Sequence, residues 1–428
     1  MPDQRRLLVF DLTAHVHLPS YLRFLIGAWN RRDSDDALDL LVHPVFMRTN
    51  ADVVALAAAS RGAVRFLTLS QDEHRQRLAH AHPAAAPHRP PATTSFADVM
   101  RGNPSSAGLS LDWQILHRYA ARERATHVLI VHLDSYLPLL ACGVEPPCRL
   151  SGIFFNSTFH HPAGAGAAGS DPRRAVALHH KFLLARTLRQ PLVHRVFFLD
   201  PFAADAAMRM PGAEKVRYLP DPVEPNRASA AQVAALRARL GIAADRRVLL
   251  LFGHLTPRKG CDLLLDALGR LTAPVCRSLC LVLAGPVGQA YRAALEARID
   301  ALCAAQPLRC VRQFGYVPDE DVASYFRLAD LVVAPYPHHT GSSGIVLLAA
   351  AAQRPVLASR HGLVGEWVRR NRLGLAVDTT DSLDIAAGVQ RWLAGLPPEI
   401  ADPDEMKRLA DEHAVERFTG TLLTVLQD

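Results

Sequence analysis

Short apolar runs alternate with longer helical segments along nearly the whole chain. The runs predict buried strands in the first half at residues 7–12, 38–43, 64–69, 127–133, 150–155, 195–199 and 216–219. The second half continues the pattern, with strands predicted at residues 248–252, 279–284, 311–314, 331–336, 355–359 and 375–377. The helical segments between them supply the crossover connections that parallel strands need. Each half is therefore predicted to be a parallel sheet with helices on both faces.

Three stretches break this alternation. The proline-rich segment 221–225 reads as a linker, residues 74–92 as an exposed loop rich in His, Pro and Ala, and residues 163–170 as a Gly/Ala loop. The predicted organisation is a first doubly wound α/β domain over residues 1–222 and a second over residues 223–402. A helix within residues 403–428 is expected to pack back across both. Two such domains facing one another would leave a cleft at the carboxyl ends of their strands, where α/β proteins bind ligands.

Composition narrows the class of protein. The chain has 428 residues, 49% of them hydrophobic and 21% charged, which is typical of a globular protein with more than one domain. No apolar run is long enough for a membrane span, and the short apolar run at residues 7–10 is too brief for a signal peptide. The seven cysteines are scattered and are expected to be free thiols. These features together predict a cytoplasmic protein.

The net charge of +7 is compatible with a phosphorylated substrate, an anionic membrane surface or a nucleic acid. The arginines are spread out, and no Lys/Arg block is interleaved with aromatic residues, so nucleic-acid binding is not expected. Loose attachment to the anionic inner face of a membrane stays open as an alternative.

A Gly/Ser loop at residues 340–344 follows the predicted strand 331–336 and opens an Ala/Leu helix. Gly341 and Gly344 allow an anion to approach the main chain, and the positive end of the helix favours a phosphate there. Ser342 and Ser343 can cap the helix and donate to phosphate oxygens. The alternative is an ordinary N-cap on a buried helix.

Two further segments follow strands of the second half. Gly253 and His254 leave strand 248–252, and Arg258 and Lys259 come shortly after them, where adjacent cations suit a diphosphate. A solvated basic pair at a helix start is the alternative. The segment 315–319 leaves strand 311–314, and its main chain could border a nucleobase, whereas simple capping of the next helix by Asp319 is the plainer interpretation.

The segments GHLTPRKGCDLLLDAL, LVLAGP, FGYVPDEDVASYFRLADLVVAPY and GSSGIVLLAAAAQRPVLAS occur in this order. As a set they resemble the donor domain of the GT-B glycosyltransferases of family 4, over about residues 216–377. The resemblance implies two Rossmann-like domains and transfer of a sugar from a nucleotide-sugar donor, with retention of configuration and without a metal or cofactor. A glycan or lipid-linked acceptor is implied by analogy.

The resemblance also implies roles for individual residues. Lys259, with Arg258 beside it, matches the lysine on the donor diphosphate, and Gly344, with Ser343 beside it, matches the phosphate-loop glycine. Tyr316 and Val317 lie in the strip that borders the base. The remaining expectations are donor contacts from Gly253, His254, Gly341 and Ser342, a contact of His160 with the transferred sugar, and an acceptor-side loop containing His15 and His17. Asp134 is a weaker polar candidate, and Glu366 is expected to be structural.

The chain departs from the family pattern at three positions. His254 replaces an arginine, and Gly341 and Ala349 replace two glutamates. A catalytically degenerate module that binds nucleotide or glycan therefore remains an alternative to a transferase. A hydrolase is disfavoured because no carboxylate pair stands out, and a dehydrogenase because no GxGxxG follows the first strand.

Overall fold

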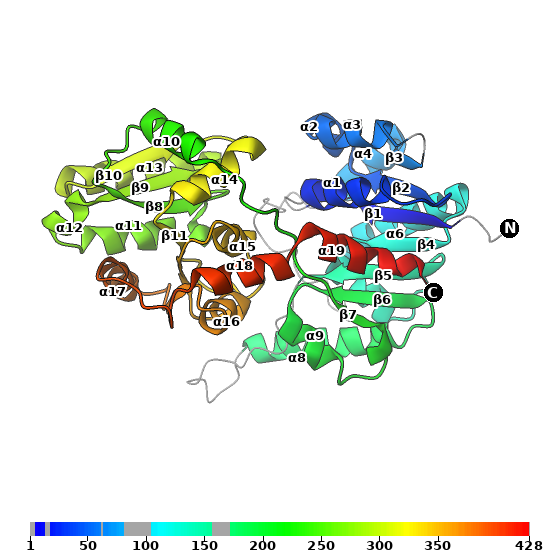
Figure 1. Ribbon diagram of the computed structural model, residues 1–428. Coiled ribbons are helices and arrows are strands. Elements are labelled where there is room, and N and C mark those ends of the chain that lie inside the picture. Colours follow the sequence, from blue (N-terminus) through cyan, green and yellow to red (C-terminus); the bar gives the residue numbers. More distant parts are fainter. Residues whose placement is uncertain (1–4, 13–17, 61–62, 81–103, 156–171, 428) are drawn as a thin grey trace. The chain divides into compact units, whose positions relative to one another are not determined.

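The computed structural model describes residues 5–12, 18–60, 63–80, 104–155 and 172–427. It divides into two compact units, shown in Figure 1. The first unit comprises Met1–Pro220 together with Glu416–Asp428, and the second comprises Asp221–Val415.

The first unit is built on a parallel sheet of seven strands in the order β3-β2-β1-β4-β5-β6-β7. Its strands are β1 (Arg6–Asp11), β2 (Ala37–Val42), β3 (Val64–Thr68), β4 (His127–Ile130), β5 (Arg149–Phe154), β6 (Val193–Phe198) and β7 (Val216–Tyr218). Its helices are α1 (Leu18–Trp29), α2 (Pro44–Thr49), α3 (Ala51–Ala58), α4 (Gln71–His80), α6 (Pro104–Glu123), α7 (Leu137–Ala141), α8 (Pro172–Leu188), α9 (Pro201–Ala207) and α19 (Val415–Leu422).

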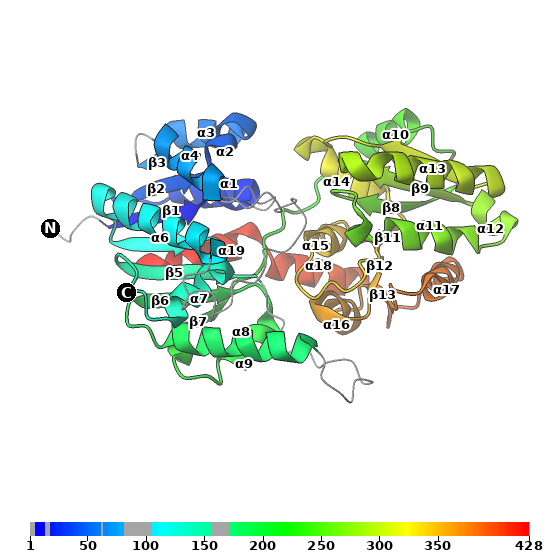
Figure 2. The same ribbon diagram turned by 180° about the vertical axis from the view of Figure 1, so that it is seen from behind.

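Successive side chains of each strand point to opposite faces of the sheet, which explains why helices cover both faces. On β1, Leu8 and Phe10 point into one hydrophobic cluster, whereas Leu7 and Val9 point into the other. Helices α6, α7 and α8 supply the first cluster, and α1, α3 and α19 supply the second. Figures 1 and 2, seen from opposite sides, show these two helical layers in turn.

The second unit is a parallel sheet of six strands in the order β10-β9-β8-β11-β12-β13. Its strands are β8 (Arg247–Phe252), β9 (Leu279–Ala284), β10 (Arg309–Gln313), β11 (Leu331–Ala334), β12 (Val356–Ser359) and β13 (Gly374–Val377). Its helices are α10 (Ala230–Arg239), α11 (Cys261–Gly269), α12 (Ala273–Arg277), α13 (Gln289–Ala305), α14 (Asp319–Leu328), α15 (Gly344–Ala351), α16 (Gly362–Arg370), α17 (Ser382–Leu393) and α18 (Pro403–Glu412).

Both sheets are doubly wound, which confirms the predicted fold class. Strand order reverses between β1 and β4 in the first sheet and between β8 and β11 in the second. Such reversals are the points where α/β sheets most often carry ligands. They direct attention to the loops that follow these four strands.

The predicted loop 74–92 is wrong at its beginning, because Gln71–His80 forms helix α4. Ser70 and Glu73 explain the helix. The amide of Glu73 donates to the Ser70 hydroxyl (3.2 Å), and the amide of Ser70 donates to Oε2 of Glu73 (2.9 Å). This reciprocal cap holds the first turn of a strongly polar segment that has little apolar periodicity. Residues 81–92, like the predicted loop 163–170, lie outside the described residues.

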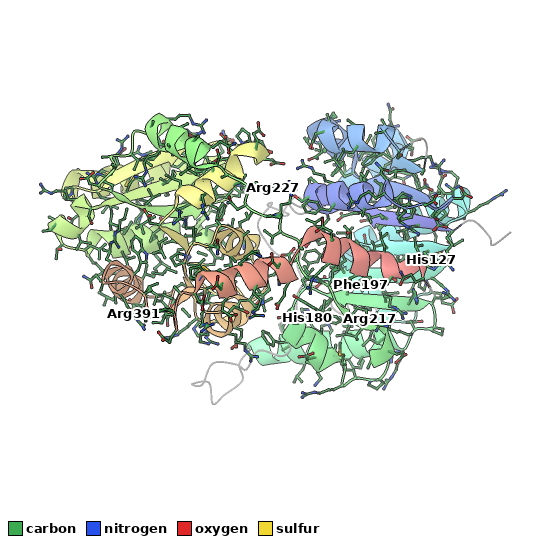
Figure 3. The ribbon with its side chains drawn as sticks, viewed as in Figure 1. His127, His180, Phe197, Arg217, Arg227 and Arg391 are labelled. Carbon is green, nitrogen blue, oxygen red and sulfur yellow. The ribbon has the colours of Figure 1, made fainter. Side chains whose placement is uncertain are left out.

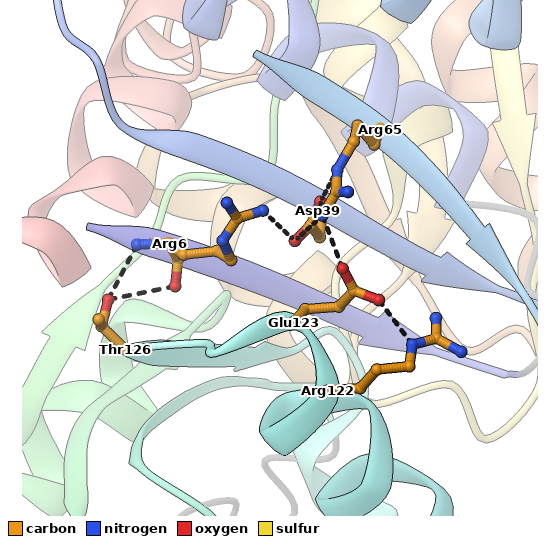
Figure 4. Close-up of polar contacts among 6 residues, drawn as sticks. All are labelled: Arg6, Asp39, Arg65, Arg122, Glu123 and Thr126. Atoms are coloured by element: carbon orange, nitrogen blue, oxygen red, sulfur yellow. Dashed lines mark hydrogen bonds and ion pairs between the residues drawn. The ribbon is translucent and has the colours of Figure 1, made fainter. Parts of the chain in front are cut away.

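A buried carboxylate ties three strands of the first sheet together at their amino ends (Figure 4). Asp39 is fully buried on β2 and accepts hydrogen bonds from Nη1 of Arg6 (3.0 Å) and Nε of Arg65 (2.8 Å). Arg65 also pairs with Glu123 (2.8 Å), which in turn accepts from Arg122 (2.7 Å). Two guanidinium groups thus neutralise a charge that would otherwise be costly inside the sheet.

The chain returns to the first unit after completing the second. Helix α18 belongs to the second unit, whereas Phe418 and Leu422 of α19 are buried in the first. The ring of Phe418 lies 4.8 Å from that of Tyr21, between centroids. The segment expected as one C-terminal element, 403–428, is therefore shared between the units.

Two points from composition can be compared with the structure. All seven cysteines are free thiols. Within the described part of the chain, no helix combines the length and the apolar character needed to cross a membrane.

Candidate functional site

The loops that follow β8, β9 and β10 stack through glycine backbones. The amide of Gly253 donates to the carbonyl of Ala284 (2.9 Å), and that of Gly315 donates to the carbonyl of Gly285 (3.3 Å). A Cβ on Gly285, whose φ is +134°, would lie only 2.1 Å from the carbonyl oxygen of Gly253. Only glycine permits this approach. The carboxyl edge of the sheet is therefore lined by bare main chain.

A short 3₁₀ turn, Pro257–Lys259, brings a lysine over this edge. The turn ends at Gly260, where φ is +70° and a Cβ would lie 1.9 Å from the carbonyl oxygen of Pro335. This close packing against the end of β11 places Nζ of Lys259 3.1 Å from the hydroxyl of Tyr336. The same ammonium lies 4.2 Å from the centre of the Tyr336 ring, within cation–π range. Tyr336 is buried and so fixes the position of the lysine.

Helix α15 begins beside the same lysine. A Cβ built on Gly253 would lie 3.6 Å from Nζ of Lys259 and 3.8 Å from Cδ1 of Ile345 in the first turn of α15. Ser343 is buried at the N-cap, and within the described residues its side chain makes no capping hydrogen bond. A Cβ on Gly344 would meet no described atom within 4 Å. The amide end of a helix, a lysine and an open glycine thus converge in one place, and each of these groups favours an anion.

The Gly/Ser loop is held by two hydrogen bonds that the sequence did not predict. Nε2 of His339 donates to the carbonyl of Ser342 (2.9 Å). The hydroxyl of Ser342 donates to Oδ2 of Asp221 (3.1 Å), a buried carboxylate whose main-chain carbonyl accepts from His413 (2.9 Å). These contacts preorganise the loop before any ligand arrives. The Asp221–Ser342 pair spans 121 residues, so no local pattern could have revealed it.

His339 is neutral at pH 7. Burial, with the charges of Arg258 and Lys259 nearby, lowers its pKa to about 4. A neutral imidazole can keep one N–H on the Ser342 carbonyl without adding charge to the loop. The paired histidines before the Gly/Ser loop were the only sequence signal that could have pointed to this role.

The other predicted donor-side residues differ in exposure. Tyr316 is 72% exposed, and its hydroxyl donates to Asp319 (2.7 Å) at the start of α14. Val317 is buried in the core, so only its main chain can meet a ligand. His254 is half-buried directly after Gly253, and Arg258 is exposed on the 3₁₀ turn.

The structure also describes the two positions at which the chain lacks the glutamates of the resembled family. Gly341 is half-buried in the loop, and Ala349 is fully buried on α15. Glu366, expected to be structural, pairs with Arg369 and Arg370 on its own helix, α16. Among the residues that the structure describes, no group of three or more His, Cys, Asp or Glu side chains could hold a metal ion.

The first unit carries a second polar cluster at its own switch point. Asp11, at the end of β1, is buried and lies 2.8 Å (Oδ2) from Nδ1 of His132, which follows β4. The His132 ring stacks on Phe155 at the end of β5, with centroids 4.5 Å apart. Asp134 accepts the amide of Phe155 (2.9 Å). The Asp11–His132 pair was not predicted, because its members are 121 residues apart.

Three predicted residues of the first domain, His15, His17 and His160, lie outside the described residues. The structure therefore leaves their assignments as predictions. It brings together Gly253, Lys259, Ser343 and Gly344 in the second unit.

Comparison with known proteins gives a family match for part of the second unit. Residues 246–395 match the family described as Glycosyl transferases group 1. The chain is 34% identical over 183 residues to the D-inositol 3-phosphate glycosyltransferase of Thermobispora bispora and 35% identical over 191 residues to that of Geodermatophilus obscurus. These matches cover 41% and 43% of the chain but only 40% and 42% of those relatives.

Solved structures resemble the whole chain in fold. The Anabaena Alr3699/HepE structure, in complex with UDP and glucose, has a TM-score of 0.63 at 15% identity and is covered over its full length. The α,α-trehalose-phosphate synthase from Burkholderia vietnamiensis has a TM-score of 0.64 at 14% identity, also over its full length. Each alignment covers 99% of this chain.

Proposed function

We propose that this chain moves a sugar from a nucleotide-sugar donor to a glycan or lipid-linked acceptor, because residues 246–395 match the family described as Glycosyl transferases group 1. The observation that carries the proposal is the meeting of Lys259, Gly253 and the first turn of α15 at the carboxyl edge of the second sheet. That meeting suits a diphosphate.

The donor is proposed to lie along this edge. Its diphosphate takes the amide end of α15 at Ser343 and Gly344, with Lys259 on the other side. Its base rests on the main chain at Gly315, where a Cβ would meet no described atom within 4 Å, and beside the exposed ring of Tyr316. An exposed aromatic ring next to a bare main-chain surface suits a flat heterocycle.

The chemical step breaks the bond between the sugar and the diphosphate. Negative charge develops on the departing phosphate oxygen, and a cation held at a fixed position stabilises it without reorganising. Tyr336 holds Lys259 at such a position, and the exposed Arg258 adds a second cation. Retention of anomeric configuration, and charge neutralisation by these side chains rather than by a metal, complete the proposal.

The first unit is proposed to bind the acceptor. The contact of Asp11 with Nδ1 of His132 favours one tautomer and one orientation of the ring, and an imidazole held in this way suits a sugar hydroxyl. The stacking of His132 on Phe155 fixes the plane of the ring.

A second candidate is a non-catalytic module that binds the nucleotide alone. Gly341 and Ala349 favour it, because a carboxylate is missing at both positions where the resembled family uses one. The two candidates differ in turnover and agree on nucleotide binding.

The deciding experiment is a thermal-shift titration with UDP, GDP and ADP, followed by release of nucleoside diphosphate from the matching sugar nucleotide. Uridine compounds come first, because Alr3699/HepE was solved with UDP and glucose. The expected result is a saturable rise in Tm with one nucleotide, lost in Lys259→Ala and retained in Lys407→Ala, which removes an exposed lysine of α18. No shift with any nucleotide would overturn the proposal. Binding without any nucleotide release, with or without glycan acceptors, would favour the module.

A further inference from the structure

Helix α8 is anchored to the first unit by its inner face. Leu183, Leu184 and Leu188 are buried in the cluster that also contains α6 and α7. Nε of Arg186 donates to the carbonyl of Ala141 (2.6 Å), and Nε2 of Gln190 donates to the carbonyl of Leu140 (2.8 Å). These contacts fix which face of the helix packs on the unit. The sequence then determines which side chains lie on the opposite face.

The outer face of α8 carries large apolar side chains. Leu178 is 68% exposed and Phe182 is 49% exposed, one helical turn apart, and Val176 is exposed nearby. These are three of the eight exposed large hydrophobic residues in the described part of the chain. A helix that already packs an apolar face on the core normally turns a polar face outward. Large apolar side chains exposed on the outer face of such a helix are typical of a contact surface.

Positive charge surrounds these apolar side chains. Lys181 and Arg189 are exposed on this side of the helix, and the Arg186 guanidinium, which also donates to the Ala141 carbonyl, lies 5.9 Å from the centre of the Phe182 ring. Between positions 172 and 199 the sequence has six Lys or Arg residues (173, 174, 181, 186, 189 and 195) and no Asp or Glu. His180, labelled in Figure 3, lies on this helix and is half-buried. The surface is thus cationic and apolar, with no acidic residue on the helix.

We propose that this outer face of α8, formed by Leu178, Lys181, Phe182 and Arg189, docks on the surface of an anionic lipid bilayer. Leucine and phenylalanine side chains enter the boundary between headgroups and acyl chains, while the cations meet lipid phosphates. A second copy of the chain fits less well. In a two-fold contact the same cations would face one another with no acidic partner on this helix.

The surface lies in the first unit, whereas the proposed donor site lies in the second, so each can fail without the other. The test is co-sedimentation of the full chain with phosphatidylglycerol/phosphatidylcholine vesicles and with pure phosphatidylcholine vesicles, at low and high salt. The expected result is binding to the anionic vesicles alone, weakened by salt because the attraction is partly electrostatic.

The variant Leu178→Glu/Phe182→Glu should reduce the bound fraction at least about fivefold. The matched control is Leu383→Glu, which alters a leucine of α17 that is 58% exposed in the other unit. An unchanged Tm for both variants verifies that each still folds. Absence of vesicle binding, or equal loss in the control, would overturn the proposal. So would a concentration-dependent dimer abolished by the double variant, which would assign the face to self-association.

Discussion

The ammonium of Lys259 lies 3.1 Å from the hydroxyl of Tyr336 and 4.2 Å from the centre of the same ring. Because Tyr336 is buried, its ring cannot move with Lys259. The lysine side chain therefore takes the position that the tyrosine allows. A long, flexible side chain is thereby held over Gly253 and next to the start of α15. This pair sets the geometry on which the proposed donor site depends.

Removing the Lys259 side chain should therefore lower activity more than removing the Tyr336 hydroxyl. Lys259→Ala is expected to lower transfer by at least about tenfold, because it deletes the charge that meets the leaving phosphate. Tyr336→Phe keeps the ring and is expected to raise the KM for the donor about two- to tenfold, the value of one hydrogen bond. The double variant should be no worse than Lys259→Ala if the tyrosine acts through the lysine. Additive losses would refute that coupling.

Gly260 is expected to tolerate no side chain. Gly260→Ala places a Cβ 1.9 Å from the Pro335 carbonyl oxygen at a φ of +70°, so the turn or the end of β11 must move. We expect a loss of about 2 kcal/mol or more in the free energy of unfolding, measured by urea denaturation. Gly288→Ala is the control, because a Cβ there meets no described atom within 4 Å. Equal effects of the two substitutions would contradict the close contact.

Asp39 should be important for stability, although it lies at the amino ends of its strands, whereas the ligands are proposed to bind at carboxyl ends. Asp39→Asn leaves Arg6 and Arg65 without their shared carboxylate and is expected to cost about 3 kcal/mol in the free energy of unfolding. Asp72→Asn, which breaks an exposed ion pair with Arg75, should cost less than about 1 kcal/mol. Thermal and urea unfolding measure both. A small effect of Asp39→Asn would mean that water reaches the network.

His339 predicts a pH dependence of stability. Burial beside Arg258 and Lys259 lowers its pKa to about 4, below the value of about 6.5 in an unfolded chain. The unfolded state therefore binds the proton first, so the contribution is complete above pH 6.5 and is lost as the pH falls through 4.

The variant His339→Gln should show a smaller loss of unfolding free energy between pH 7 and pH 4, the difference from the parent being at most about 3 kcal/mol. His338→Gln, at the exposed neighbouring position, should behave like the parent. An identical pH profile for parent and His339→Gln would show that the imidazole does not stay neutral.

The Asp11–His132 pair gives a prediction on the acceptor side. Asp11→Asn should raise the acceptor KM several-fold and His132→Ala at least about tenfold, because the first loosens the ring and the second removes it. Neither should alter the Tm shift caused by the donor nucleotide. A lost nucleotide response would place the pair in the donor site.

Sequence reasoning succeeded where the signal is local. Apolar runs predicted the strands of both sheets, and glycines after β8, β10 and β11 marked loops that the structure brings to one edge. It failed for helix α4, whose composition is polar and whose only local signal is the pairing of Ser70 with Glu73. Helices α9 and α17 were also missed, although each begins at an aspartate that caps it: Asp200 and Asp381.

The sequence allowed the loops of the candidate site to be predicted, but not the hydrogen bonds that connect their residues. Lys259 and Gly344 could be selected from their positions after strands. Their partners could not, because Tyr336 lies 77 residues from Lys259 and Asp221 lies 121 residues from Ser342. Contacts of this kind depend on how the strands are ordered in the sheet, which a single sequence does not state.

The burial of Phe418 and Leu422 beneath the first sheet has a consequence for biosynthesis. The first unit cannot close its second hydrophobic layer until residues beyond Glu416 have left the ribosome, and by then all of the second unit has emerged. The second unit can fold while the first still exposes Tyr21 and its neighbours. Maturation is thus expected to run from the middle of the chain outward, with the first unit open to chaperones until translation has passed the second.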